Sequence, residues 1–294
     1  MPADNRVQIT DFRTKDHARA RYRFDERKRH AAPPLDEIPV VARDARAPVV
    51  VVAADARVMA YHFVTGDFEK RTVFLPDKEY GLALDALVKG CADVLISRGS
   101  GASLRLLLGK RKVEPQPDWW YIGGRSKPGE TPEAAAARNV RRELKLDLPL
   151  ERFEVVANYS FVWQFRQQPP AGNGTADIST VHRLALGDAE VAGAVFDEKE
   201  YAATKWWPAE DVLSGDFHPA LKQAIRDVRA ADAFKRLREL VVAGGADADV
   251  ATAARLLVET AGARDAAVDA LGGADGAPVA VSFANGQYTY RRAA

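Results

Sequence analysis

The stretch from Tyr121 to Leu148, YIGGRSKPGETPEAAAARNVRRELKLDL, constrains the fold of this chain more than any other. A loop rich in glycine and proline leads to Thr131, a good N-cap residue, and to Pro132, whose missing N–H costs nothing at the first position of a helix. The alanine run over residues 134–137 has the highest helix propensity. The stretch therefore predicts a loop that leads directly into a helix.

Two positions on that helix, Asn139 and Glu143, are four residues apart and share one face. Glutamate at both positions would form a site for Mg²⁺ bridging a diphosphate, because hard metal ions prefer carboxylate oxygens. Asn139 offers only a neutral amide oxygen, and Arg142 adds a positive charge that would repel a metal but could neutralise phosphate. We therefore expect at most one ion, bound to Glu143.

The chain has 294 residues, a formal net charge of +1 and one cysteine, Cys91. The near-neutral charge argues against a chain built to coat nucleic acid or a membrane, so phosphate binding must be local. A single cysteine allows no internal disulfide, which fits a reducing compartment. The N-terminus has no apolar signal sequence, and no stretch reaches the ~20 apolar residues needed to span a bilayer. We expect a soluble, cytoplasmic protein.

Composition and periodicity divide the chain into four expected parts. Residues 1–47 mix basic and acidic side chains and predict a solvated, flexible arm. Residues 48–77 predict a short β-rich extension. Residues 78–235 are the expected main domain, and residues 236–294 predict a helical segment followed by a hairpin around Asn285–Gly286.

The main domain is expected to alternate helices and strands. In chain order, we expect a helix over residues 77–90, a hairpin over 91–111, the helix of the opening stretch, strands over 153–165 and 178–187, a strand end and short helix over 205–215, and a long helix over 218–245. A further helix is expected over residues 249–262.

The spacing of Gly124, Glu130, Arg138 and Glu143 resembles the Nudix box of nucleoside-diphosphate-X hydrolases. Val140 and Leu146 also fit that box, whereas Asn139, Arg142 and Lys145 depart from it. The resemblance implies an α/β fold: a Nudix α/β/α sandwich with a mixed sheet. Outside it we expect an N-terminal β-containing extension and a small C-terminal α+β appendage.

The reduced box is most similar to the GDP-mannose mannosyl hydrolase branch, which keeps the last glutamate and loses the earlier ones. The segments LLLGKRKVEPQPDWWYIGGR, YSFVWQF and VLSGDFHPAL follow in that branch's order, over about residues 78 to 230. The resemblance implies a Mg²⁺-dependent enzyme, with Mn²⁺ as an alternative ion, acting on a nucleoside diphosphate sugar. It would cleave the glycosyl C–O bond and release sugar and nucleoside diphosphate. A homodimer is expected on the resemblance alone.

The resemblance also assigns roles to individual residues. The Gly123 carbonyl and Glu143 would bind the metal ion. Arg111 and Arg125, from the Gly-Lys-Arg and Gly-Gly-Arg elements, would assist the leaving diphosphate, and Arg142 would add a further positive charge beside it.

His182 occupies the strand position where the branch has a tyrosine that contacts the diphosphate. The late loop DEKEY holds Glu198 and Glu200 where the branch has a glutamine on the metal and a histidine as general base. We take Glu200 as the base and Glu198 as the metal ligand, although either carboxylate could fill either role. Trp120 is the candidate for stacking on a nucleobase.

Two other functions stay open. Asn139, Arg142 and Lys199 favour a degenerate Nudix domain that binds or senses a nucleotide without turnover. The C-terminal helices and hairpin would suit a winged helix in a Nudix-type transcription regulator. However, residues 246–276 are acidic, whereas a helix that reads DNA should be basic. We therefore expect no nucleic-acid partner.

Overall fold

The computed structural model of the chain describes residues 8–10, 19–21, 69, 71, 73–196, 199–270, 279–284 and 287–292. Contacts divide the chain into two compact units, Met1–Val52 and Ala53–Ala294. Within the first unit, strand β1 (Gln8–Thr10) pairs antiparallel with β2 (Arg19–Arg21). Most of the predicted charged arm lies outside the described residues.

The β-rich extension predicted over residues 48–77 also lies almost entirely outside the described residues. Residues 73–76, where the second strand of its hairpin was expected to end, form no strand. The side chain of Phe74 is 91% exposed there, so the prediction of strand structure at this point is wrong. Among the described residues no strand pairs with residues 73–76, and apolar composition alone does not make a strand.

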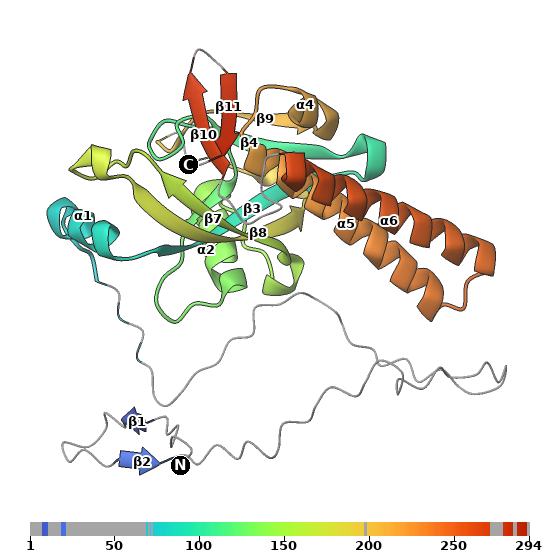
Figure 1. The fold of residues 1–294 in the computed structure, drawn as a ribbon, viewed down its shortest axis with the longest axis horizontal. Helices are drawn as coiled ribbons and strands as arrows, with labels where there is room; N and C mark the ends of the chain where they lie inside the picture. Colours follow the sequence, from blue (N-terminus) through green and yellow to red (C-terminus); the bar gives the residue numbers. More distant parts are fainter. Residues whose placement is uncertain are drawn as a thin grey trace. The chain divides into compact units, whose positions relative to one another are not determined.

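The second unit is organised around an open, seven-stranded sheet (Figure 1). Its strands are β3 (Lys89–Arg98), β4 (Arg105–Arg111), β5 (Trp119–Trp120), β6 (Ile122–Arg125), β7 (Glu154–Trp163), β8 (Thr175–Ala185) and β9 (Tyr201–Pro208). The central strand β3 pairs parallel with β8 and antiparallel with β4 and β6. Strand β7 pairs antiparallel with β8, and β9 with β4. The predicted mixed sheet is confirmed.

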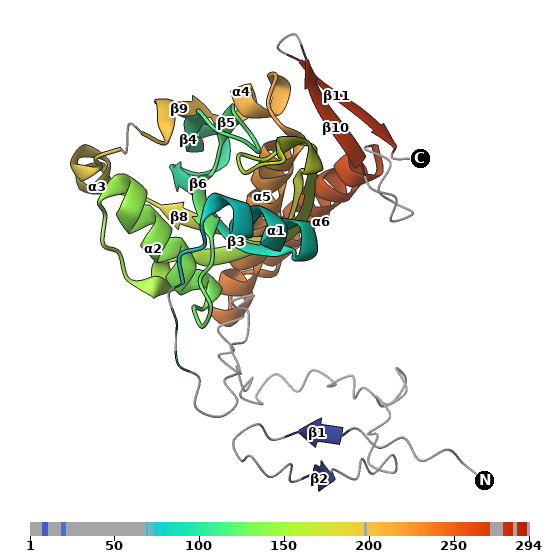
Figure 2. The same cartoon turned by 90° about the vertical axis from the view of Figure 1, so that its left-hand side faces the viewer.

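Helices cover both faces of this sheet. The described helices of this unit are α1 (Asp77–Ala86), α2 (Pro132–Leu144), α3 (Asp188–Gly193), α4 (Ala209–Ser214), α5 (Pro219–Val242) and α6 (Asp247–Ala270), with short 3-10 turns η3 (Gly101–Ser103), η4 (Leu150–Arg152) and η5 (Ala171–Asn173). Helices α2 and α5 lie on opposite sides of the sheet (Figure 2). The layers are therefore helix, sheet and helix, as predicted for the Nudix α/β/α sandwich.

Strand alternation explains the two separate cores, because successive residues of β3 point to opposite faces. On the α2 face, Val94 and Ile96 pack against Ala136 and Val140 of the helix. On the α5 face, the core is larger and rich in aromatic rings, and it contains the following residues: Leu95, Leu106, Leu108, Trp120, Tyr121, Val181, Leu221 and Ile225. The alanines of α2 allow that helix to approach the sheet closely.

Helix α2 begins where its sequence predicts. The Thr131 side chain accepts a hydrogen bond from the Ala134 N–H at 3.1 Å, which confirms the predicted N-cap. At the other end, Lys145 adopts a left-handed conformation with φ of 60°. Its Nζ donates to the carbonyl oxygen of Arg142 at 2.6 Å, so the side chain itself satisfies a carbonyl group in the last turn.

Two predicted boundaries are wrong because tertiary pairing overrides local propensity. Helix α1 ends at Ala86 rather than at residue 90, because Lys89 and Gly90 pair with Asp177 and Ile178 of β8. Pairing with Trp163 of β7 starts β8 at Thr175, three residues before the predicted strand.

The C-terminal part contains the helices and hairpin that the sequence predicts. Helix α5 continues through residue 235, where the main domain was expected to end, and packs against α6. Strands β10 (Val279–Ala284) and β11 (Gln287–Arg292) pair antiparallel, while the predicted turn residues Asn285–Gly286 lie outside the described residues.

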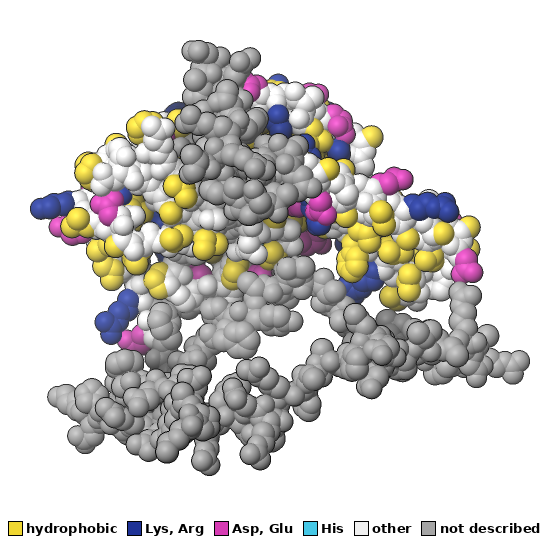
Figure 3. Space-filling view, in the orientation of Figure 1, with side chains coloured by type: hydrophobic (Ala, Val, Ile, Leu, Met, Phe, Trp, Pro, Cys, Tyr) yellow, Lys and Arg dark blue, Asp and Glu magenta, His cyan; other side chains and the backbone are white. Residues whose placement is uncertain are grey.

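Figure 3 shows hydrophobic side chains along the α5–α6 pair. The homodimer stays a prediction.

Among the helices that the structure describes, none combines the length and the apolar character that crossing a membrane requires.

Candidate functional site

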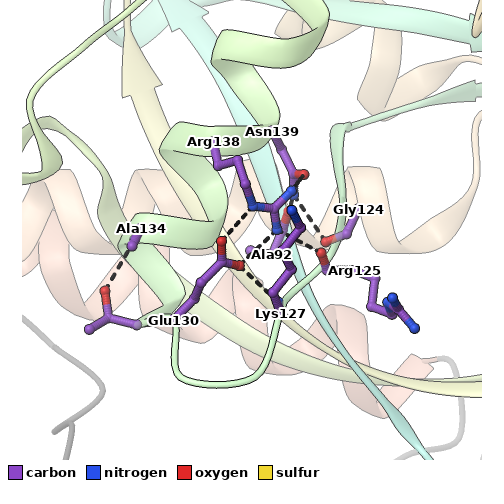
Figure 4. Close-up of polar contacts among 9 residues, drawn as sticks. Ala92, Gly124, Arg125, Lys127, Glu130, Ala134, Arg138 and Asn139 are labelled. Atoms are coloured by element: carbon purple, nitrogen blue, oxygen red, sulfur yellow. Dashed lines mark hydrogen bonds and ion pairs between the residues drawn. The ribbon is translucent and has the colours of Figure 1, made fainter. Parts of the chain in front are cut away.

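The loop before α2 is held to the helix by one charged clamp. Arg138 donates from Nε and Nη2 to the two carboxylate oxygens of Glu130, at 2.6 and 2.8 Å (Figure 4). The Lys127 N–H donates to the same carboxylate at 2.8 Å, and Arg138 Nη2 also reaches the Arg125 carbonyl oxygen at 2.9 Å. These contacts lower the pKa of Glu130, with the Arg138 hydrogen bonds as the main cause. Glu130 and Arg138 therefore fix the loop rather than face a ligand.

Asn139 links the middle of α2 to the sheet. Its side chain is fully buried, and Nδ2 donates to the carbonyl oxygens of Gly124 at 3.0 Å and Ala92 at 3.3 Å. Its Oδ1 accepts from Arg138 Nη1 at 3.0 Å. At the position where the usual box has a carboxylate, Asn139 therefore has a neutral amide that bridges the helix and the sheet.

Glu143 forms the centre of a charged cluster at the end of α2. Glu143 is 1% exposed. Its Oε1 accepts a hydrogen bond from Arg142 Nη2, and its Oε2 accepts one from the Tyr201 hydroxyl. Burial raises the pKa of Glu143, and the hydrogen bond from Tyr201 and the charge of Arg142 oppose that shift. Burial also raises the pKa of Tyr201, which keeps the hydroxyl protonated as a donor.

Arg111 and Glu200 lie beside this cluster. Arg111 is the cross-strand partner of Tyr201 in the β4–β9 ladder, and its charge opposes the rise in the pKa of Tyr201. The negative charge of Glu200 contributes to the raised pKa of Glu143. The backbone of Glu200 is fixed by a hydrogen bond from the Lys112 N–H to its carbonyl oxygen at 3.2 Å. The fold therefore joins Arg142, Glu143 and Tyr201 by hydrogen bonds and brings Arg111 and Glu200 close enough to act on them through their charges.

Arg125 is directed away from this cluster. Figure 4 shows its side chain pointing away from Asn139, and the guanidinium carbon lies 5.0 Å above the centroid of the Tyr80 ring. In β6, a Cβ on Gly124 would point toward Arg142, whereas a Cβ on Gly123 would meet Asp93 Oδ1 at 2.5 Å. Gly123 is thus a glycine because strand β3 approaches it closely on the other face.

His182 and Trp120 also lie apart from Glu143. The His182 side chain is fully buried in β8, and burial lowers its pKa. Trp120 is 4% exposed and packs edge-on against four other rings, those of Tyr121, Phe161, Trp163 and His218. The roles given to both residues stay predictions, and Glu198 lies outside the described residues.

Sequence reasoning missed two residues of this region. Tyr201 is a buried partner of Glu143, and the only signal for it was a tyrosine directly after the acidic loop. Asp93 lies in the apolar run GCADVLIS, where an isolated carboxyl group could have drawn attention. Burial raises the pKa of Asp93 to about 6, although Ser179 Oγ donates to its Oδ2 at 2.7 Å.

The described residues do not fit the divalent ion that the resemblance implies. No group of three or more His, Cys, Asp or Glu side chains in the described part of the chain is placed to hold a metal ion. Both Glu143 oxygens have protein partners, and Asn139 is bonded to the backbone and to Arg138. A positive guanidinium occupies the position beside the carboxylate where an ion would bind.

Comparison with known proteins identifies the class of this domain. Residues 89–228 match the family model described as the NUDIX domain. This span starts at the first residue of β3 and ends within α5. This part of the chain is therefore similar to the Nudix domain. The comparisons do not support the narrower assignment to the GDP-mannose mannosyl hydrolase branch.

Similar solved structures also contain Nudix or hydrolase domains. A Caenorhabditis elegans Ap4A hydrolase binary complex has 19% identity and a TM-score of 0.38, covering 50% of this chain and 98% of that chain. The Escherichia coli dihydroneopterin triphosphate pyrophosphohydrolase has 24% identity and a TM-score of 0.36, covering 48% and 95%. The NUDIX domain of Shewanella oneidensis NrtR, complexed with ADP ribose, has 17% identity and a TM-score of 0.37, covering 53% and 97%.

Proposed function

We propose that this Nudix domain hydrolyses a compound that contains a diphosphate group, with nucleoside diphosphate sugars as the first class to test. The observation that carries the proposal is the ion pair of Arg142 with Glu143, bonded to Tyr201, on which the charges of Arg111 and Glu200 also act. Arg142 and Glu143 come from α2, Arg111 from β4, and Glu200 from the turn before β9.

The two arginines suit the diphosphate. Guanidinium groups form paired, charge-assisted hydrogen bonds with phosphate oxygens. Such contacts strengthen when negative charge develops on a leaving diphosphate. The Arg142 side chain is 49% exposed, so it has N–H groups available beyond its contact with Glu143.

Glu200 is our candidate for the general base. It is partly buried, and its charge acts on both Arg142 and Glu143. A carboxylate in this position would accept a proton from water as the water oxygen attacks the substrate. Attack at the sugar carbon breaks the glycosyl C–O bond, and the nucleoside diphosphate leaves with the bonding electron pair.

The test is product analysis in ¹⁸O-labelled water with a panel that includes GDP-mannose and ADP-ribose. Free sugar carrying the label supports C–O cleavage, whereas labelled phosphate in a nucleoside monophosphate or sugar phosphate rejects it. Glu200→Gln should lower kcat by about 100-fold or more, in the range typical of general bases. Glu79→Gln, an exposed position on α1, is the matched control.

A second candidate function is nucleotide binding without turnover. Asn139 favours it, because this buried amide is committed to three hydrogen bonds within the protein. Saturable binding of panel members with no product after prolonged incubation would support this second function and exclude hydrolysis of those compounds.

A further inference from the structure

Arg142 lies between the buried carboxylate of Glu143 and Gly124 of strand β6. Its Nη2 donates to Glu143 Oε1, and a Cβ on Gly124 would lie 3.3 Å from the same nitrogen. The Glu143 side chain is 2% exposed, whereas that of Arg142 is 49% exposed. One edge of the guanidinium therefore neutralises a buried negative charge, and the rest of the group faces the surface.

In the ion pair, Arg142 supplies the positive charge beside Glu143 that a divalent ion would otherwise supply. A Mg²⁺ ion needs a near-octahedral set of oxygen ligands, and at this position it would have to displace a cation. The second Glu143 oxygen is held by Tyr201, and Asn139 binds the Gly124 carbonyl oxygen. Without Arg142, Glu143 would be a buried charge with no cation beside it. Separation of the two side chains therefore costs a large free-energy penalty.

We propose that Arg142 is the resident cation of this site and that the domain binds the diphosphate group of its ligand without a divalent ion. The inference rests on the proposed function in one respect, namely that the ligand contains a diphosphate. Arg111, the cross-strand partner of Tyr201, supplies a second cation for the same group. Mg²⁺ in solution would compete with both arginines for the phosphate oxygens, so it should weaken binding.

The first experiment is calorimetric titration of the full chain with inorganic pyrophosphate, in EDTA and in excess Mg²⁺. We expect binding in EDTA and affinity reduced several-fold by Mg²⁺. Binding that appears only with Mg²⁺ overturns the inference but leaves the diphosphate ligand in place. An absence of binding under both conditions overturns the diphosphate ligand and the inference together.

Variants of two adjacent arginines make the test specific. Arg142→Gln removes the cation and should lower affinity for pyrophosphate in EDTA by about 10-fold or more, because a charge-assisted contact is lost. Arg141→Gln is the matched control, since Arg141 is 62% exposed and lies 3.8 Å from Asp147. It should change affinity less than about twofold. Unchanged affinity in Arg142→Gln, with circular dichroism showing a folded protein, overturns the inference.

Binding of Mn²⁺ alone tests the site without any diphosphate. We expect electron paramagnetic resonance to detect no bound Mn²⁺ in the wild-type protein at concentrations where Arg142→Glu binds it. That variant replaces the cation by a carboxylate one residue from Glu143, which supplies the oxygen ligands that hard ions prefer. Wild-type binding of Mn²⁺ that is abolished by Glu143→Gln would show instead that Arg142 gives way to a metal.

Discussion

Asn139 on the α2 face of the sheet and Asp93 on the α5 face are both buried polar residues, but their environments differ. On the α2 face, Asn139 is neutral, fully buried and committed to three hydrogen bonds. On the α5 face, Asp93 is an ionisable group that is 8% exposed and accepts one side-chain hydrogen bond, from Ser179. A buried amide whose hydrogen bonds are all made stabilises the fold. Ionisation of a buried carboxylate with few partners destabilises the folded state.

This contrast also separates the candidate residues into two groups. Arg142, Glu143 and Tyr201 belong to the polar cluster at the end of α2, whereas Trp120 belongs to the aromatic core under α5. A nucleobase stacked on Trp120 would have to enter that core. The charged cluster, by contrast, has a half-exposed arginine at the surface.

The largest effect is expected from the aromatic core. Trp120→Ala should destabilise the protein by about 3–5 kcal/mol, since the deletion of a large buried ring leaves a cavity. Trp206→Ala is the control, because Trp206 is only partly buried and lies under the Arg98 guanidinium at 4.7 Å. Urea denaturation followed by fluorescence measures both. A loss for Trp120→Ala no larger than that of the control would contradict a core role.

A smaller loss is expected on the α2 face. Asn139→Ala leaves the carbonyl oxygen of Gly124 and a nitrogen of Arg138 without their partner, which should cost about 2–3 kcal/mol. Asn158→Ala is the control, since Asn158 is exposed and accepts one hydrogen bond from Thr180 at 2.8 Å. Equal stability of the two variants in chemical denaturation would mean that the buried amide is not a structural bridge.

Asp93→Asn should instead stabilise the protein, by roughly 1–3 kcal/mol above pH 7. The folded-state pKa of Asp93 is raised to about 6, above the ordinary value near 3.9. Protonation of the wild-type carboxyl group therefore favours folding, and wild-type stability from this group rises as the pH falls from above 6 toward 4. The advantage of the variant should shrink over the same range. An advantage that is independent of pH would exclude ionisation of Asp93 as the cause.

The smallest effect at neutral pH is expected at His218. Its Nδ1 caps α5 by accepting from the Ala220 N–H at 3.1 Å, and burial lowers its pKa to about 3. Stability from the neutral ring is complete above pH 6.5 and is lost as the pH falls toward 3, by at most ~1.4 kcal/mol per pH unit. His218→Asn keeps a capping oxygen, so it should change stability by less than about 1 kcal/mol at pH 7.

The pH dependence is the decisive measurement for that variant. The difference in unfolding free energy between His218→Asn and wild type, followed from pH 7 to pH 4, should move in favour of the variant. Since Asp93 is present in both proteins, its opposite contribution cancels in the difference. A difference that stays constant with pH would mean that His218 has the same pKa in the folded and the unfolded protein.

Much of the fold follows from local sequence. The Thr131 cap and the alanine run predicted helix α2 and its loop, and the structure confirms the helix and its cap. The hairpin of β3 and β4, the helices α5 and α6, and the β10–β11 hairpin also follow from their periodicity. These features depend on neighbouring residues, which is why one sequence suffices to predict them.

The charged site follows from sequence only in part. Glu143 and Arg142 are adjacent in the chain, so their relevance to phosphate or metal could be argued from the helix alone. Tyr201 is 58 residues from Glu143, and only the pairing of β9 with β4 places its hydroxyl on that carboxylate. The direction of Arg125 was equally hidden, because alternation along β6 depends on the register with β3.

The sequence by itself determined that this chain has a Nudix loop and helix whose box lacks two of the usual carboxylates. Only the tertiary structure decided what those substitutions do. Asn139 bonds to a strand carbonyl, and Arg142 neutralises Glu143, because the sheet brings Gly124 and Tyr201 against the helix. A sequence states which charges are present, but the net effect of a buried charge depends on the partners that long-range packing places beside it.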